Sequence, residues 1–332
     1  MDHHQRSLRL GAALILCALL TRLSDSGLVR SVAELLAKPN IASMLIYLET
    51  GRFVRFSPSW EPVFAGESAA PDFAREEAVV PAFSTADAEA VPVRYNCSVR
   101  PDLGQLLASP LTWNLADGEP RVLILHTHTT ESYTRAAGES YRETSAYRTL
   151  DEDYNMLSIG DRLAELLEAG GVKVIHDREL HDYPSYNGSY NHARKSIQAV
   201  LTEYPTVKLV LDLHRDASGD NHNQMKTYAT VAGKSSAQLM LVVGTDSTGK
   251  SNPHWEENLA VALKVQVQTE RLHPGVMRYV NLRSQRFNQD LLPGTLLVEV
   301  GAAGNSHSEA ITAVEALAEG ILALARGTGS GT

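Results

Sequence analysis

The sequence predicts an α/β fold, a three-layer domain with a mostly parallel sheet and helices on both faces. From about residue 118, short apolar runs typical of buried strands alternate with stretches whose apolar residues recur at helical spacing. Polar residues suited to chemistry lie within or directly after three of the apolar runs, where ligands bind in parallel sheets. With 332 residues, 43% of them hydrophobic and 21% charged, the chain can form a packed core.

The expected elements alternate along the chain in the order that βαβ units require. The strands are expected at 122–125, 172–175, 207–213, 239–243 and 296–300. The helices are expected at 157–167, 193–201, 259–272 and from Ser306 to about residue 325. Gly170 and Gly171 end the first helix, Pro205 follows the second, and Ser306 with Glu309 forms a capping box for the last.

The N-terminus reads as a membrane signal. Arg6 and Arg9 precede an apolar run over 10–20, which is about 11 residues long, nearer a signal sequence than the roughly 20 residues of a spanning helix. No A-x-A-like cleavage site follows, so we favour an uncleaved signal-anchor over a cleaved signal, and either places the rest of the chain outside the cytoplasm.

Composition divides the chain into four parts. We expect a membrane anchor or signal at 1–24, a juxtamembrane region and linker at 25–117, a catalytic domain at 118–326 and a flexible tail at 327–332. The segment 61–93, rich in Ala, Pro, Glu and Asp, suits a linker.

Charge and cysteine content exclude two classes of function. A net charge of −9 would repel nucleic-acid phosphates, so we expect no nucleic acid among the partners. Two cysteines are too few for a disulfide scaffold or a cysteine-rich zinc site. A metal would therefore be held by histidines and carboxylates.

Histidines and carboxylates gather at one expected edge of the sheet. The first strand is followed by His126-Thr-His128-Thr-Thr-Glu131, and the strand 207–213 is followed by His214. Glu299 lies inside the last strand, where a carboxylate needs a partner if it is buried. Because carboxyl ends of parallel strands share an edge, we expect these side chains to meet.

Two histidines and one carboxylate form a common catalytic zinc set, which leaves a fourth position for water. We predict that His128, Glu131 and His214 bind Zn²⁺, with His126 as the alternative to His128. We predict that Glu299 is the catalytic group that takes a proton from the water and passes it to the leaving amine.

Further polar residues are expected to bind substrate or to orient the ligands. Asp212 and Asp216 could accept the second ring N–H of a ligand histidine, and Arg215 could pair with a substrate carboxylate or with either aspartate. The loop over 181–194 has the composition of a sugar or peptide groove. The candidates of this kind are His126, Arg215, Asp216, Tyr186, Asn187 and Tyr190.

Several separated strings resemble the stage II sporulation protein P family. They are LILHTHTTESYT (123–134), HDYPSYNGSYNHARKSI (181–197), LVLDLHRDA (209–217), LMLVVGT (239–245) and FNQDLLPGTLLVEVGAAGNSHSEA (287–310). The resemblance implies a membrane-anchored peptidoglycan hydrolase that thins the septal wall during forespore engulfment. It implies N-acetylmuramoyl-L-alanine amidase and endopeptidase activities, a catalytic domain outside the cytoplasm, and stage II sporulation proteins D and M as partners.

The resemblance also implies a site and a fold. The family's domain is similar to amidase_3-type zinc amidases, which share a topology with zinc carboxypeptidases. Their His/Glu/His zinc set and late Glu fall here on His128 or His126, Glu131, His214 and Glu299. In cell-wall amidases the first His and the Glu lie much further apart, so the choice between the two histidines stays open.

Two alternatives to the amidase remain. One is a zinc carboxypeptidase-like enzyme that trims stem peptides, which an arginine deep in a closed pocket would favour. The other is a non-catalytic wall-binding scaffold, against which the intact ligands and Glu299 argue.

Overall fold

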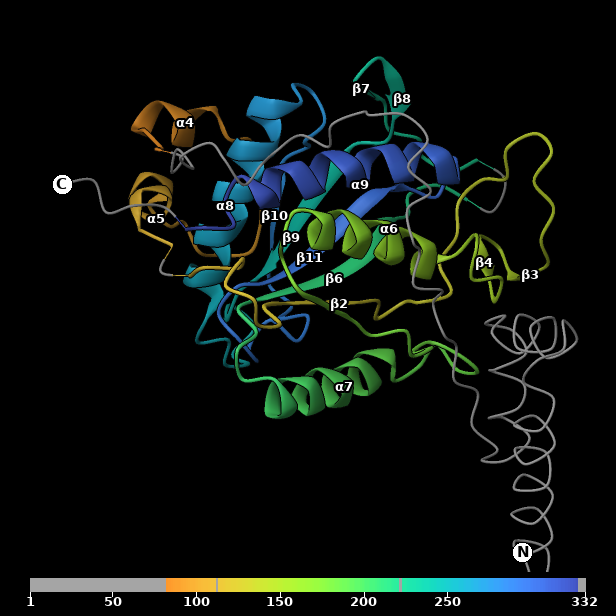
Figure 1. The fold of residues 1–332 in the computed structure, drawn as a ribbon, viewed down its shortest axis with the longest axis horizontal. Coiled ribbons are helices and arrows are strands. Elements are labelled where there is room, and N and C mark those ends of the chain that lie inside the picture. Colours follow the sequence, from red (N-terminus) through yellow and green to blue (C-terminus); the bar gives the residue numbers. More distant parts are fainter. Residues whose placement is uncertain (1–81, 112, 221–222, 328–332) are drawn as a thin grey trace, which may run out of the picture. The chain divides into compact units, whose positions relative to one another are not determined.

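A seven-stranded sheet forms the centre of the computed structural model, which describes residues 82–111, 113–220 and 223–327 (Figure 1). Across the sheet, the strands are β1 (Val93–Asn96), β10 (Val280–Arg283), β9 (Leu239–Gly244), β11 (Thr295–Ala302), β6 (Leu209–Asp216), β2 (Val122–Leu125) and β5 (Val174–His176). All neighbours are parallel except β9 and β11, which are antiparallel. The mostly parallel sheet is confirmed, with β1, β10 and β9 running opposite to the other four strands.

Helices lie on both faces of this sheet, so the described part has three layers (Figure 1). One face carries α6 (Met156–Ala169), α8 (Trp255–Leu272) and α9 (His307–Leu322), and the short α4 (Thr85–Ala90) and α5 (Leu103–Ala108) lie on that side. The other face carries α7 (Ser189–Glu203). Two small hairpins are formed by β3 (Glu143–Ser145) with β4 (Arg148–Thr149), and by β7 (Ala229–Val231) with β8 (Lys234–Ser236).

Successive side chains of a strand point to opposite faces of the sheet, and this decides which residues can reach the site. In β6, Leu211 and Leu213 are fully buried in the large core beneath α6, α8 and α9. Val210 belongs to the smaller core under α7. Because successive strand residues point to opposite faces, Asp212 and His214 share the α7 face with Val210. Polar groups of β6 therefore gather beside α7.

The expected helix signals are present in the structure. Ser306 accepts a hydrogen bond from the Glu309 amide, and the Glu309 carboxylate accepts one from the Ser306 amide at 2.9 Å, which forms the capping box of α9. Gly170 is the C-cap of α6. Strand β6 extends to Asp216, so His214 lies inside the strand.

The sheet takes its edge strand β1 from the stretch expected as N-terminal region and linker, and α4 and α5 lie there too. The expected anchor at 1–24 lies outside the described residues. Among the helices that the structure describes, none has the length and apolar character needed to cross a membrane.

Candidate metal and catalytic site

The segment that follows β2 is a buried turn. His128 and Glu131 are 7% and 5% exposed, and the Glu131 amide donates to the carbonyl of His128 at 3.1 Å. This turn brings two side chains three residues apart towards β6. The hydrogen bond between the two backbones closes the turn, and this fixes the spacing of the two side chains.

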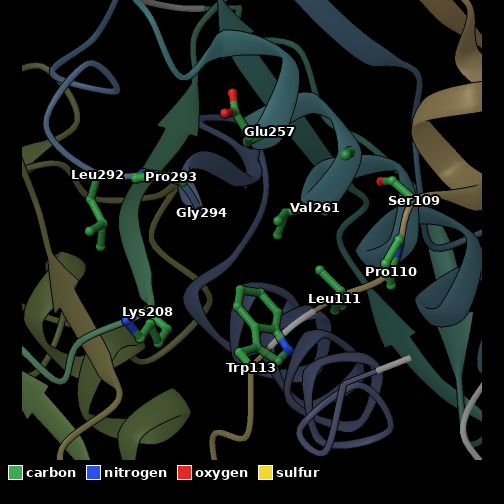
Figure 2. Close-up of a pocket in the computed structure, with 11 residues that line it drawn as sticks. Ser109, Pro110, Leu111, Trp113, Lys208, Glu257, Val261, Leu292, Pro293 and Gly294 are labelled. Atoms are coloured by element: carbon green, nitrogen blue, oxygen red, sulfur yellow. The ribbon is translucent and has the colours of Figure 1, made fainter. Parts of the chain in front are cut away.

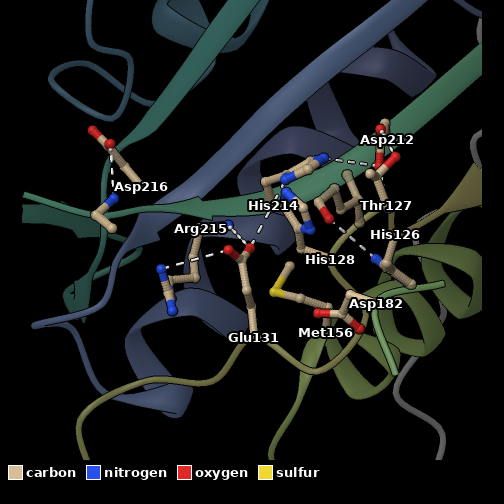
Figure 3. A network of polar contacts seen from close by, with 12 residues as sticks. His126, Thr127, His128, Glu131, Met156, Asp182, Asp212, His214, Arg215 and Asp216 are labelled. Carbon is tan, nitrogen blue, oxygen red and sulfur yellow. Dashed lines mark hydrogen bonds and ion pairs between the residues drawn. The ribbon is translucent and has the colours of Figure 1, made fainter. Parts of the chain in front are cut away.

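His128, Glu131 and His214 come together at the end of β6 (Figure 3). The rings of His128 and His214 are perpendicular, with centroids 5.2 Å apart. Nδ1 of His214 lies 3.9 Å from Oε2 of Glu131. The three residues predicted as ligands are therefore neighbours, although His214 is far from the other two in the chain.

Asp212 is the charged partner of His214. Its Oδ1 lies 3.0 Å from Nε2 of His214, and its carboxylate also accepts from the amide and hydroxyl of Thr127, at 2.8 and 2.6 Å. Burial alone would lower the pKa of His214, but Asp212 and the Glu131 and Glu299 carboxylates raise it to about 9. Nδ1 is left facing Glu131.

His128 also has one committed nitrogen and one uncommitted nitrogen. Nε2 lies 3.2 Å from the Tyr186 hydroxyl, and the two rings stack with centroids 4.6 Å apart. Nδ1 is buried and has no hydrogen-bond partner among the described residues. Burial lowers the pKa of His128 to about 4, so the ring is neutral at physiological pH and has a lone pair to offer.

The two oxygens of Glu131 have different surroundings. Oε1 lies 3.2 Å from the Arg148 guanidinium and 3.6 Å from that of Arg215. Oε2 accepts from the Arg215 amide at 3.2 Å and faces His214. Burial would raise the pKa of Glu131, but the charges of Arg215, His214 and Arg148 lower it, so the group is a carboxylate.

Glu299 lies beside His214 because the two are paired across β11 and β6. Its Oε2 is buried and has no hydrogen-bond partner among the described residues. Burial raises the pKa of Glu299 to about 8, against the opposing effect of His214. A carboxyl group that titrates near neutral pH can both accept and donate a proton.

These donors fit a zinc ion. Zinc takes imidazole nitrogens and carboxylate oxygens, and its ligand histidines usually bind a second group through the other ring nitrogen. The unpartnered Nδ1 of His128 and Oε2 of Glu131 have lone pairs to offer. Nδ1 of His214 would offer one after losing its proton to the solvent as a metal binds. The remaining nitrogens contact Tyr186 and Asp212.

His126 lies in a different environment. Its Nδ1 lies 3.2 Å from the carbonyl oxygen of Leu213, and its Nε2 lies 2.8 Å from Nε2 of His176. It is fully buried, and burial lowers its pKa to about 3. Both nitrogens are engaged, so His126 has none to offer a metal without rearrangement.

The residues expected to contact substrate fall into two groups. Tyr186 and Asn187 are exposed on the loop before α7, and Tyr190 lies at the start of α7 with its ring 5.6 Å from that of His128. Burial and the nearby Asp212 carboxylate raise the pKa of Tyr190, which stays a neutral phenol. These tyrosines surround the outer side of His128.

Arg215 and Asp216 instead make contacts within the protein. Arg215 donates to the carbonyl oxygens of Ser132 and Tyr147 at 3.1 and 3.0 Å, besides its contact with Glu131. Asp216 accepts from Arg278 at 2.8 Å. The Arg215 guanidinium is thus used to hold the turn that carries Glu131.

Sequence reasoning missed Arg148, on strand β4. It bridges the Glu131 carboxylate to that of Asp182 and lies over the Tyr186 ring at 4.9 Å. Asp182 in turn accepts from the amide and hydroxyl of Thr130, at 3.1 and 2.8 Å. Arg148 therefore holds the turn after β2 that carries the candidate ligands His128 and Glu131, and no sequence motif marks this arginine.

Another group of possible ligands, Asp177, Glu179 and His181, lies on the loop after β5, with one atom of each within 4.8 Å of the others. Asp177 already pairs with His181 at 3.1 Å and accepts from Ser196 and the Glu179 amide. These contacts show that the three residues stabilise the loop that carries Tyr186.

A cavity of about 380 Å³ lies at the other end of the sheet (Figure 2). Its lining includes Lys208 and Gly294, which directly precede β6 and β11, together with Trp113 and Val261. The candidate site lies towards the carboxyl ends of the same two strands, so this cavity takes no part in it.

The comparison with protein families identifies the chain. The model of the stage II sporulation protein P family matches residues 68–322. The chain belongs to this family. Stage II sporulation protein P of Bacillus subtilis is 28% identical over 209 residues, which cover 60% of this chain and 49% of that protein. The chain therefore matches about half the length of this family member.

Three similar solved structures are amidases, and two of them, AmiC2 and Ami1, are named N-acetylmuramoyl-L-alanine amidases. AmiC2 of Nostoc punctiforme is 17% identical, with a TM-score of 0.34, covering 61% of this chain and 95% of that one. The CwlD amidase of Clostridioides difficile, in complex with the GerS lipoprotein, is 15% identical, with a TM-score of 0.34 and coverage of 60% and 96%. Ami1 of Mycobacterium smegmatis is 14% identical, with a TM-score of 0.35 and coverage of 63% and 96%. Family membership rests on the sequence match.

Proposed function

We propose that this chain is a zinc-dependent peptidoglycan hydrolase with N-acetylmuramoyl-L-alanine amidase and endopeptidase activity. It acts in septal wall thinning and forespore engulfment during sporulation. Membership of the stage II sporulation protein P family supports the biological setting. The observation that carries the chemistry is the meeting of His128, Glu131 and His214 beside the buried carboxyl of Glu299.

In this proposal His128 and His214 bind zinc through Nδ1, and Glu131 binds through Oε2. Bound there, Zn²⁺ would polarise the scissile carbonyl and acidify a water molecule. Asp212 holds the His214 ring by its Nε2, and the Tyr186 hydroxyl does the same for His128. His126 is set aside as a ligand because Leu213 and His176 engage both of its nitrogens.

Glu299 moves the proton. Its carboxyl titrates near neutral pH, so Oε2 can take a proton from the attacking water and release it to the leaving amine. The neighbouring His214 is held by Asp212 and is not free to take this proton. A glutamine at position 299 could do neither.

The carboxypeptidase alternative needs an arginine deep in a closed pocket, directly beside the reacting groups, that is free to bind a terminal carboxylate. Arg215 follows the candidate ligand His214 in the chain, but its guanidinium already contacts Ser132, Tyr147 and Glu131. This supports a hydrolase that acts within a polymer. A non-catalytic scaffold would have no use for a buried carboxyl whose pKa is raised to about 8, because that carboxyl costs stability.

Metal analysis combined with mass spectrometry of digested sacculi tests the proposal. We expect about one zinc per chain and products cleaved between muramic acid and L-alanine. Glu299→Gln should keep the zinc and the fold and lower the cleavage rate at least about a hundredfold. Glu165→Gln, on the exposed side of α6, is the control. A Glu299→Gln protein that digests sacculi as fast as the parent would refute the role of Glu299.

We further propose that the chain is held in the cell membrane by residues 1–24, with its catalytic domain outside the cytoplasm at the septal and engulfing membrane. The apolar run bounded by arginines supports this placement. Stage II sporulation proteins D and M are proposed as partners from the family alone. Fractionation of cells and co-purification of the full chain test both; recovery in the soluble fraction alone would count against the anchor.

A further inference from the structure

Half of one sheet face has no helix over it in the described part of the chain. Helix α7 packs on β2, β5 and β6 (Figure 1). Beyond it, on the same face, the residues of β9 and β11 form a small apolar cluster of Met240, Val242 and Leu297, flanked by Tyr279 and Phe287. Next to this cluster are the outward positions of β10 and β1.

Those outward positions form what we call the arginine platform. It consists of Arg94 and Asn96 of β1, Asn281 and Arg283 of β10, and Tyr279 just before β10. Arg94 lies over the Tyr279 ring at 5.6 Å and donates to its hydroxyl at 3.2 Å. The Asn96 amide donates to Asn281 at 2.8 Å. The side chains are thus pre-ordered by contacts with one another.

The charge of the arginine platform is one-sided. Its five positions include no aspartate or glutamate, in a chain whose acidic residues outnumber basic ones 39 to 30. Arg94 and Arg283 have no carboxylate ion pair among the described residues. Two flanking arginines differ: Arg278 pairs with Asp216 at 2.8 Å and Arg286 with Asp290 at 3.3 Å. Two unpaired guanidinium groups on a half-exposed sheet attract carboxylates.

The arginine platform lies on the same sheet face as Glu299 and His214. Met240 pairs with Glu299, and Glu299 pairs with His214, in one row across the sheet. Tyr279, which precedes β10 on the far side of β9, packs against the apolar cluster that contains Met240. Arg283 is level with Gly244, which lies four residues along β9 from Met240, the partner of Glu299. Two strand spacings and four residues amount to roughly 16 Å between Arg283 and Glu299, or the span of about five extended peptide residues.

We propose that the arginine platform binds the stem peptide of the substrate through its free carboxylates, with Arg94 and Arg283 as the binding groups. The identity of the polymer rests on the proposed function. Stem peptides carry carboxylates along their length and at their end, within the reach of about five residues from the bond to be cut. The apolar cluster of Met240, Val242 and Leu297 then forms the floor between the reacting bond and the carboxylates.

Binding of a synthetic stem tetrapeptide to zinc-loaded Glu299→Gln protein, measured by calorimetry, tests this proposal without any need for hydrolysis. We expect the peptide with free carboxylates to bind more tightly than the same peptide with amidated carboxylates. The additional changes Arg94→Ala and Arg283→Ala together should weaken binding of the free-carboxylate peptide about tenfold, since exposed charge pairs contribute modestly. Binding should also weaken as salt is raised.

Arg100→Ala is the matched control. Arg100 is exposed just after β1, but it lies over Tyr95, which packs against the core on the opposite face of the sheet. The proposal is overturned if the double variant binds as tightly as its parent, or if it loses affinity equally for the free and amidated peptides. Digestion of sacculi by the unmutated chain judges the proposed function separately. An unmutated chain that binds acidic peptide through these arginines but cuts nothing would refute the hydrolase and leave the arginine platform standing.

Discussion

Replacing Glu299 by glutamine should stabilise the metal-free protein at alkaline pH, although it removes the proposed proton carrier. Burial raises the pKa of Glu299 from 4.5 to about 8. The folded state therefore binds this proton more tightly than the unfolded state. The resulting stability is fully present below pH 4.5 and is lost as the pH rises through 8. Glutamine does not ionise, so the variant avoids that loss.

The size of the effect follows from the two pKa values. The interval from 4.5 to about 8 corresponds to roughly 5 kcal/mol of unfolding free energy above pH 8. The Glu299 carboxylate also favours the charged form of His214, and the variant loses that contribution. We therefore expect Glu299→Gln to exceed the parent by roughly 2–4 kcal/mol at pH 8.5 and to match it within about 1 kcal/mol at pH 4.5.

Urea unfolding after removal of metal by EDTA measures this difference at both pH values. Glu309→Gln is a control of opposite sign. Burial would raise the pKa of Glu309, but its contacts with Lys226, Ser306 and Asn305 hold it at about 2. Its stabilising effect is present above pH 4.5 and is lost as the pH falls through 2, so this variant should be less stable than the parent at pH 8.5.

One result would refute the reasoning. If the difference between Glu299→Gln and the parent is the same at pH 4.5 and at pH 8.5, the carboxyl of Glu299 is not held in its protonated form by burial. Its assignment as a group that both takes and returns a proton near neutral pH would then lose its physical basis.

Three further predictions concern the surroundings of the site. Asp212→Asn should lower zinc affinity about 10–100-fold, because the amide cannot hold His214 as the carboxylate does; competition with a chromophoric chelator measures this, and unchanged affinity would contradict it. Arg148→Ala should lower the rate of sacculus cleavage about tenfold with the fold retained. Arg148→Lys should not restore the rate, because one ammonium group cannot bridge two carboxylates as a guanidinium does, and full rescue by lysine in the turbidity assay would argue against bridging. Gly160→Ala should cost about 1–3 kcal/mol in urea unfolding, because its Cβ would overlap the His126 and His176 rings; wild-type stability would show that those rings can move.

The sequence predicted the strands that carry the site because their signal is local. The run before His126 is continuously apolar and the run that ends at Leu213 is almost so, as in strands buried on both faces. The capping box of Ser306 and Glu309 is equally local, and the structure contains it. Convergence of Glu131, His214 and Glu299 followed from parallel topology alone.

The features that sequence reasoning missed depend on distant contacts. Which of His126 and His128 lies beside His214 depends on Thr127, which is held between them by Asp212 from another strand. Arg148 reaches Glu131 only because the hairpin of β3 and β4 folds back over the turn. The sequence did not indicate that β9 runs antiparallel to β11, because a buried apolar run such as LMLVVG has the same composition in either direction.

The antiparallel pairing of β9 with β11 divides the sheet into two sets of strands that run in opposite directions. Strands β2, β6 and β11 bring the candidate ligands and the carboxyl to the site with their carboxyl ends, whereas β9 and β10 approach it with their amino ends. Substitutions in β1 and β10, beyond β9, therefore leave the pairing of β2, β6 and β11 intact. The surface formed by β1 and β10 can then diversify among members of the family, or be redesigned in one of them, while the strands that carry the candidate ligands stay unchanged.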